Sequence, residues 1–175
     1  MEGYRQVGGK GTRMSDAKPG DWKTKPLPGE RTTISLDREF STREMERIRR
    51  GVVPRQMEDK WFIYWEDDSL HFHRSWTGFC VYIARFTKEA AGWRMIRALV
   101  NRKPEQYRET SDERDRKMIS WLVDVLLLHR NVPFPDEGSL GGDPIISVWS
   151  LAGRALFAQH PKDLDVDGKK KGDGS

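Results

Sequence analysis

The sequence predicts an α+β domain in which a four-stranded antiparallel meander packs against about three helices, with a flexible tail at each end. Two observations lead to this prediction. Residues 57–86 are rich in aromatic side chains and are interrupted by turn-forming residues, which is typical of short strands joined by tight connections. Three other segments repeat apolar residues at helical spacing directly after helix-capping residues. Helices beside consecutive antiparallel strands are characteristic of the α+β class.

Composition divides the chain into one domain and two tails. Residues 1–33 hold six glycines and three prolines, show no hydrophobic period and carry a net charge of +3, which predicts a flexible basic arm. Residues 161–175 have no net charge and predict a second flexible tail. The remaining residues, 34–160, have the length of a single domain and a net charge of +1. The overall charge of +4 is therefore mainly a property of the arm.

The first predicted helix is defined by its end signals. Residues 34–40 precede it as a short first strand or an extended lead-in. Ser41 and Glu44 have the spacing of a capping box, and Gly51 and Pro54 end the helical pattern. The charged face of this helix is expected to be solvated; it consists of Arg43, Glu46, Arg47, Arg49 and Arg50.

Four strands follow, at residues 61–66, 70–74, 79–86 and 93–100. The connections between them are so short that neighbouring strands must be antiparallel. Within 61–66, apolar side chains occupy both faces of the strand. We therefore expect the second face to be covered by the third helix or by another chain, so that a homodimer is one expected assembly.

Two more helices are predicted after the strands. One begins behind a second capping box, Thr110 and Glu113, and is apolar on most of its surface, so we expect it to be the central packing helix. The third begins at Asp143, with Pro144 in the favoured first position, and continues its apolar pattern to Leu156.

The corner between the second and third predicted strands, His73–Gly78, is the best candidate site. Arg74 can hold a phosphate or carboxylate, Trp76 can stack on a base or sugar, and Gly78 lets a ligand approach the backbone. The candidate ligand-binding residues are Arg74, Ser75, Trp76, Thr77, Gly78, Lys60 and Arg102. In the competing interpretation this is a structural corner, where Arg74 pairs with Glu66 or Asp67 and Trp76 covers the core.

Two histidines are the candidates for catalysis. His71 and His73 lie on one face of the second predicted strand, opposite Leu70 and Phe72, and either can act as an acid or base. Their spacing also suits two metal ligands, but a third ligand such as Asp67 would be needed. The competing interpretation, half-exposed histidines on the solvent side of the sheet, is favoured. We predict no metal site and no cofactor.

The single cysteine and a glycine-rich loop are weaker candidates. Cys80 lies inside the third predicted strand and is expected to be buried and inert, although a Cys/His nucleophilic pair is conceivable. The Gly138–Asp143 loop opens onto a helix N-terminus, which can bind phosphate. However, Asp143 places a negative charge where the phosphate would lie, so a flexible loop with a capping aspartate is expected.

Several segments resemble a known family. MEDKWFIYWEDD, LHFHRSWTGFC and VNRKPEQYRET, together with the preceding REMERIRRGVVPRQ, are similar to a family of small uncharacterised bacterial proteins. The resemblance covers about residues 36–130 and is most specific from Met57 to Gly78. It implies a bacterial or phage cytoplasmic setting and brings no catalytic residue with it. The residues that it assigns to the family pattern are Glu58, Asp59, Lys60, Trp61, His73, Arg74, Trp76 and Gly78.

These observations favour a small cytoplasmic binding or regulatory module that recognises an anionic small ligand, such as a phosphorylated molecule, or a protein partner through the His73–Gly78 corner. One alternative is a small enzyme acting on a nucleotide or ADP-ribose-like substrate. Another is a nucleic-acid-binding protein that uses the basic arm, although the near-neutral domain argues against it. A single cysteine excludes a disulfide framework, and no apolar run is long enough to span a membrane.

Overall fold

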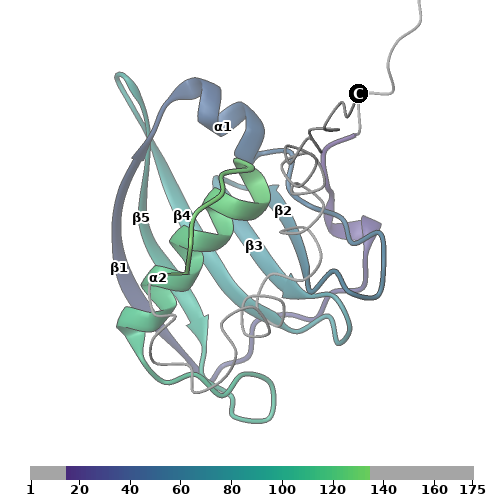
Figure 1. Ribbon diagram of the computed structural model, residues 1–175. Helices are drawn as coiled ribbons and strands as arrows, with labels where there is room; N and C mark the ends of the chain where they lie inside the picture. The colour runs from purple at the N-terminus through teal and green to yellow at the C-terminus, as the bar shows by residue number, and fades with distance from the viewer. Residues whose placement is uncertain (1–14, 135–175) are drawn as a thin grey trace, which may run out of the picture.

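The computed structural model describes residues 15–134, in which a five-stranded antiparallel sheet lies behind two α-helices (Figure 1). The strands are β1 (Arg31–Phe40), β2 (Trp61–Glu66), β3 (Ser69–Arg74), β4 (Cys80–Glu89) and β5 (Gly92–Asn101), in the spatial order β1-β5-β4-β3-β2. The helices are α1 (Thr42–Ile48) and α2 (Asp112–Leu122), which continues into a π-helical turn, Val123–Leu127. A 3-10 turn, Pro19–Asp21, precedes the sheet. The predicted α+β class is confirmed.

The meander from β2 to β5 is confirmed as well. Each of these strands pairs with the next along the chain in antiparallel register. Asp67 and Asp68, between β2 and β3, both adopt left-handed backbone angles, with φ of 49° and 54°. Two consecutive left-handed residues are the signature of a tight hairpin turn whose twist matches that of the strands. The short connection predicted between residues 61–66 and 70–74 is therefore confirmed.

The fifth strand, β1, corrects the predicted count of four. It pairs along its whole length with β5, interrupted by a bulge between Ser35 and Arg38. Only Ile34 and Phe40 are buried in this strand, because β1 lies at the edge of the sheet and presents its other side chains at or near the surface. The bulge breaks the two-residue period. A polar, bulged edge strand carries little local hydrophobic signal, so the sequence predicts at most a short strand there.

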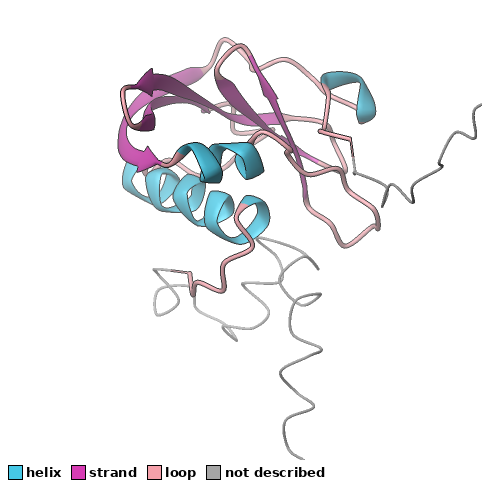
Figure 2. Cartoon of the chain, turned by 90° about the horizontal axis from the view of Figure 1, so that it is seen from above, coloured by secondary structure: helices cyan, strands magenta, loops and turns pink. Residues whose placement is uncertain are grey.

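Both helices lie on the same side of the sheet (Figure 2). The predicted capping box of α1 is present, since the Ser41 hydroxyl accepts from the Glu44 N–H at 3.1 Å and the Glu44 carboxylate accepts from the Ser41 N–H at 2.7 Å. Helix α2 begins one residue later than predicted, because Ser111 rather than Thr110 is its N-cap. The Glu109 carboxylate binds the backbone N–H groups of both Thr110 and Ser111.

The predicted third helix, which begins at Asp143, lies outside the described residues, as do the Gly138–Asp143 loop, residues 1–14 of the predicted arm and the predicted tail at 161–175. Two α-helices and the π-helical turn are therefore what residues 15–134 contribute to the helical layer. Together with the sheet they enclose the main core, whose largest fully buried members include Trp61, Phe72, Tyr82 and Ile119.

The described part of the predicted flexible arm is bound to the sheet. We call residues 15–25 the N-terminal strap. It is held by three hydrogen bonds: from the Ala17 N–H to the Arg50 carbonyl (2.8 Å), from Trp22 Nε1–H to the Ser75 carbonyl (2.7 Å), and from the Lys25 N–H to the Gly78 carbonyl (2.8 Å). Ala17 and Trp22 pack with Phe62 and Tyr64 in a second apolar cluster. The strap thus helps to cover the second apolar face of β2, for which the sequence predicts another helix or another chain.

Candidate functional site

The side chains of the predicted corner between β3 and β4, His73–Gly78, lie in three different parts of the structure. His73 is 3% exposed and packs with the second cluster, where its Nδ1 lies 2.9 Å from the Gly78 carbonyl oxygen. Arg74 lies on the opposite face, because successive side chains of a strand alternate, and its guanidinium carbon is 4.3 Å from the centre of the Trp61 ring. Trp76 is 56% exposed. The corner is therefore not a single pocket.

Two contacts that the competing structural interpretation predicts for Arg74 and Trp76 are absent. Arg74 does not pair with Glu66 or Asp67, because the register places Arg74 opposite Trp61, while Glu66 stands opposite Ser69 at the other end of the hairpin. Trp76 does not cover the core. Its indole projects from the turn after β3, and its Nε1–H donates to the Met57 carbonyl at 2.7 Å.

Three residues of the corner serve its own geometry. The Ser75 hydroxyl is buried and donates to the Asp59 carbonyl at 2.5 Å. The Thr77 hydroxyl accepts from the backbone N–H two residues later, at 3.3 Å. Gly78 has a φ of 78°, and a Cβ at this position would lie 3.0 Å from the Lys23 carbonyl oxygen of the strap. These contacts match the structural interpretation of Ser75, Thr77 and Gly78.

Trp76 and Met57 are the exposed large hydrophobic side chains of residues 15–134, at 56% and 74% exposure, and the Trp76 indole binds the backbone of Met57. The ammonium group of Lys60 lies 4.4 Å from the centre of the Trp76 ring, a cation–π contact. We call Met57, Lys60 and Trp76 the Trp76 surface. Of the predicted ligand-binding residues, the structure thus brings Lys60 and Trp76 together.

Hydrogen bonds hold the loop that carries this surface. The Asp59 carboxylate accepts from the backbone N–H groups of Arg55 and Gln56, at 2.8 and 3.3 Å. The Ser75 N–H donates to the Lys60 carbonyl at 3.0 Å. The loop is therefore pinned both to itself and to the corner, which fixes the backbone from which Met57 projects.

The histidines do not share a pocket with Arg74. His71 stacks on Tyr64, with ring centres 4.7 Å apart and planes within 5°, and burial, reinforced by nearby His73, lowers its pKa to about 4. Burial also lowers the pKa of His73, against the opposing effect of its hydrogen bond to Gly78. Nε2 of His73 is buried and has no hydrogen-bond partner among residues 15–134. Burial thus disfavours the protonated form of both rings, and His73 is buried rather than half-exposed as predicted.

Neither a metal-binding cluster nor an activated thiol is formed among the described residues. No three His, Cys, Asp or Glu side chains in residues 15–134 are grouped to hold a metal ion. Cys80 is buried, and burial raises the pKa of its thiol to about 12. The prediction of a buried cysteine is confirmed, and burial disfavours the thiolate, which is the reactive form.

Arg102 belongs to a buried network that sequence reasoning missed. Its guanidinium donates to Asp112 at 2.8 Å and to Asp115 at 2.6 Å. Asp115 is completely buried and lies within hydrogen-bond distance of the hydroxyls of Tyr82 (2.9 Å) and Tyr107 (2.7 Å). Burial alone would lower the pKa of Arg102, but its two aspartates outweigh this effect and raise the pKa. Arg102 therefore binds α2 and does not contribute to the His73–Gly78 corner.

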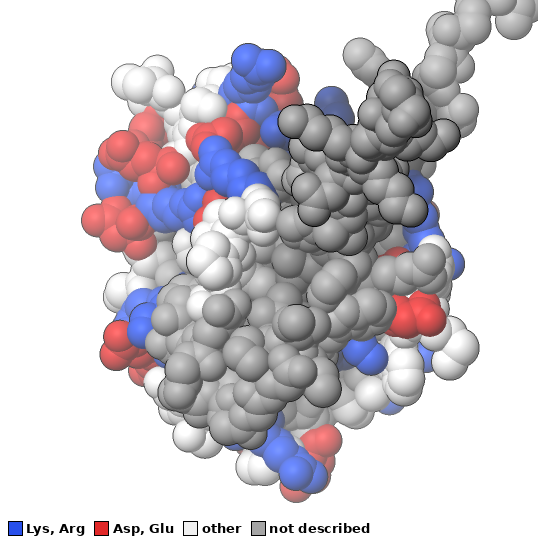
Figure 3. Space-filling view, in the orientation of Figure 1, with Lys and Arg blue, Asp and Glu red and all other residues white. Residues whose placement is uncertain are grey.

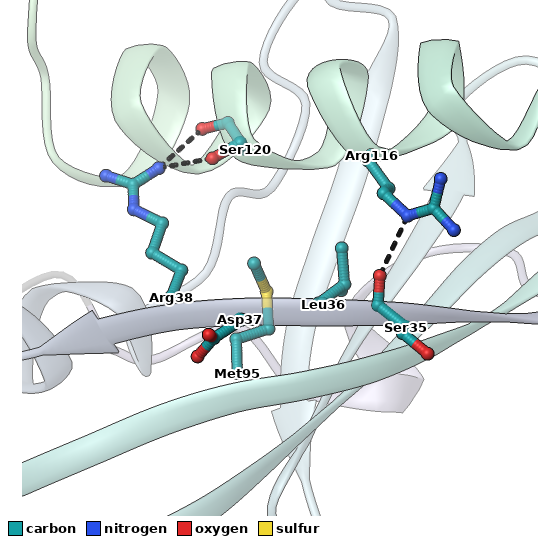
Figure 4. Close-up of a pocket in the computed structure, with 7 residues that line it drawn as sticks. All are labelled: Ser35, Leu36, Asp37, Arg38, Met95, Arg116 and Ser120. Carbon is teal, nitrogen blue, oxygen red and sulfur yellow. Dashed lines mark hydrogen bonds between the residues drawn. The ribbon is translucent and has the colours of Figure 1, made fainter.

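A pocket of about 370 Å³ opens between β1 and α2 (Figure 4). It is lined by Ser35, Leu36, Asp37, Arg38, Met95, Arg116 and Ser120. Arg38 reaches from the strand to Ser120 and to the Asp124 carboxylate, while Arg116 reaches from the helix to the Ser35 carbonyl at 2.9 Å. These two side chains cross-link strand and helix. Nothing in the sequence brings these partners together, since they are more than 80 residues apart.

Charges of both signs lie side by side on the described part of the face in Figure 3. Arg94 forms ion pairs with Asp37, Glu39 and Glu89. Arg130 likewise bridges Glu44 and Asp124. These arginines are already neutralised by carboxylates, so they do not extend a basic stripe of the kind that binds nucleic-acid backbones.

The function of this α+β domain is inferred from the geometry of its described residues. Comparison of the chain with models of protein families, with curated proteins and with solved structures gives no match. Among residues 15–134, neither helix combines the length and the apolar character that crossing a bilayer requires.

Proposed function

We propose that this protein is a non-catalytic binding module that docks a protein partner through the Trp76 surface. One observation carries the proposal: Met57 and Trp76 carry the exposed large hydrophobic side chains of residues 15–134, and the Trp76 indole N–H donates to the Met57 backbone carbonyl. Tryptophan and methionine are enriched in protein interfaces, and tryptophan is among the residues that most often dominate binding energy.

The rigidity of the surface supports the same proposal. The Trp76 indole N–H donates to the Met57 carbonyl, and hydrogen bonds of Asp59 and Ser75 hold the loop that carries Met57. Binding therefore needs little further ordering of the backbone, which lowers its entropic cost. The unbranched Met57 side chain, in contrast, can adapt to the shape of the partner.

The charges indicate the chemistry of the partner. Lys60 lies over the Trp76 ring, so a partner that covers the indole also meets an ammonium group. A segment with an apolar side chain next to an aspartate or glutamate would satisfy both groups. We infer that the partner presents such an acidic and apolar segment.

The enzyme alternative receives no support from the geometry. It requires His71 or His73 and Arg74 to line one concave pocket. The two histidines pack against Tyr64 on one face of the sheet, whereas Arg74 packs against Trp61 on the other. A substrate phosphate held by Arg74 would therefore lie across the sheet from both rings.

Peptide selection from a random display library against the immobilised full-length chain tests the proposal. We expect enrichment of sequences that combine an aromatic or aliphatic residue with a neighbouring Asp or Glu. Binding of the selected peptides should weaken at least about tenfold in Trp76→Ala, which corresponds to about 1.4 kcal/mol and exceeds the roughly 1 kcal/mol that most interface residues cost on truncation. Lys60→Glu should weaken binding too.

Arg97→Ala is the matched control, because Arg97 is an exposed side chain of β5 away from this surface. The exposed Trp76 contributes little to the core, so Trp76→Ala should unfold within about 1 kcal/mol of the wild type. Failure to enrich any peptide, or peptides that bind Trp76→Ala as tightly as the wild type, would overturn the proposal.

A further inference from the structure

Six arginines of residues 15–134 are partly buried, and their partners differ. Four form ion pairs with carboxylates: Arg38 with Asp124, Arg94 with Asp37, Glu39 and Glu89, Arg102 with Asp112 and Asp115, and Arg114 with Glu109. Pairing is the usual condition for removing a charge from water. The two exceptions, Arg49 and Arg74, place their guanidinium groups over tryptophan rings instead.

The two exceptions are not equivalent. Arg49 contacts two indoles, those of Trp65 and Trp93, at 5.2 and 4.6 Å. Arg74 contacts one indole, that of Trp61, at 4.3 Å. No side-chain hydrogen bond or ion pair of Arg74 is formed with any residue from 15 to 134. Burial lowers the pKa of Arg74, which means that this desolvated charge is incompletely compensated.

The backbone of Arg74 is fixed at the end of β3, and its guanidinium rests on an aromatic ring of the core. Its backbone N–H donates to the Phe79 carbonyl at 2.9 Å, and its carbonyl accepts from the Gly78 N–H at 2.8 Å. Beneath it, Trp61 is 1% exposed and stacks on the buried Tyr82 ring, with centres 6.2 Å apart and planes within 15°. Cation, indole and phenol thus form three layers, of which the lower two are fixed in the core.

Arg74 is partly exposed to solvent. Among residues 15–134, the side-chain nitrogens and oxygens that are fully buried without a partner are Nε of Arg49 and Nε2 of His73. The nitrogens of Arg74 are not among them, and the face of its guanidinium rests on Trp61. A guanidinium in this state presents a fork of hydrogen-bond donors that matches the geometry of an oxyanion.

We propose that Arg74 anchors an oxyanion-binding site at the end of β3, on the face of the sheet that carries the helices, and that it takes a carboxylate or phosphate group. The core fixes the aromatic layer beneath the guanidinium, so the donors are partly preorganised. Binding the anion compensates the desolvated charge that the described residues leave unpaired. The site is separate from the Trp76 surface and does not depend on the proposed protein partner.

An NMR titration of the full-length protein tests the site. The Arg74 Nε–Hε and Trp61 indole signals are followed while inorganic phosphate, acetate or chloride is added at constant ionic strength and pH. We expect saturable shifts of both signals with phosphate, acetate or both, and none with chloride. A response to phosphate alone assigns the site to phosphate groups, and a response to acetate alone assigns it to carboxylates.

The variants identify the residue. Arg74→Lys keeps the charge but loses the planar fork, and should weaken binding at least tenfold, whereas Arg97→Lys, at an exposed arginine of β5, should bind as the wild type does. Trp76→Ala should also retain anion binding, which separates this site from the proposed protein-binding surface. Absence of a saturable shift in the wild type would overturn the proposal, and so would unchanged binding in a folded Arg74→Lys variant. If Arg74→Lys does not fold, the wild-type titration decides alone.

Discussion

Replacing Asp115 by alanine should destabilise the domain by about 3–4 kcal/mol. The carboxylate is completely buried and is within hydrogen-bond distance of Tyr82, Tyr107 and Arg102. Three hydrogen bonds to a charged group, at about 1.5 kcal/mol each, amount to roughly 4–5 kcal/mol. Part of this is retained, because the two phenol hydroxyls remain 2.6 Å apart and Arg102 keeps Asp112. The remainder falls within the roughly 3–5 kcal/mol observed when one member of a buried ion pair is removed.

Urea unfolding followed by tryptophan fluorescence measures this loss. With a typical slope of roughly 1–2 kcal/mol per molar urea, the midpoint should fall by about 2 M. Asp112→Ala is the matched control, because Asp112 binds the same guanidinium but its side chain is half exposed, and it should cost about 1 kcal/mol or less. If Asp115→Ala and Asp112→Ala shifted the midpoint equally, the reasoning from burial would be refuted.

Two further predictions concern the face covered by the strap. The free energy of unfolding should fall as the pH drops from about 6.5 towards 4. Unfolded His71 takes up a proton in this window, whereas folded His71, with its pKa lowered to about 4, does not. The full effect is at most about 3 kcal/mol. Thermal unfolding between pH 4.5 and 7.5 measures it, and His71→Gln should flatten the profile; an equally steep profile in that variant would contradict the assignment. Gly78→Ala should cost about 1–3 kcal/mol, because φ is 78° and the new Cβ lies 3.0 Å from the Lys23 carbonyl. Hydrogen exchange at the Lys25 amide should accelerate in this variant but not in Gly20→Ala, where the new Cβ meets nothing within 4 Å; unchanged Lys25 protection in Gly78→Ala would count against the strap contact.

Local sequence signals predicted most of the secondary structure. The Ser41 and Glu44 capping box and the Asp67–Asp68 turn act between residues no more than a few positions apart, so their chemistry is complete in the sequence. The alternation of β3 correctly separates His71 from Phe72, because side chains on a strand alternate regardless of what covers them. β1 was predicted only as a short strand or an extended lead-in at residues 34–40, because its full length depends on pairing with β5, about 60 residues away.

The candidate site was predicted in composition but not in arrangement. Sequence reasoning singled out Lys60, Arg74 and Trp76 as ligand-binding candidates, and its competing structural interpretation placed Arg74 against the acidic hairpin tip and Trp76 on the core. The register of β2 and β3 instead puts Arg74 on Trp61, and the turn after β3 exposes Trp76. Both outcomes depend on which strand end meets which, and that information is not local.

By itself, the sequence determined the fold class, the meander and the start of α1, because periodicity and capping are properties of neighbouring residues. The tertiary structure alone decided what the exceptional side chains do. It brought the strap across Phe62 and Tyr64, buried Asp115 among two tyrosines and an arginine, and left the Arg74 donors without a carboxylate in residues 15–134. The physical reason is that the partner of a buried polar group is chosen by proximity in space, which only the packing of distant segments creates.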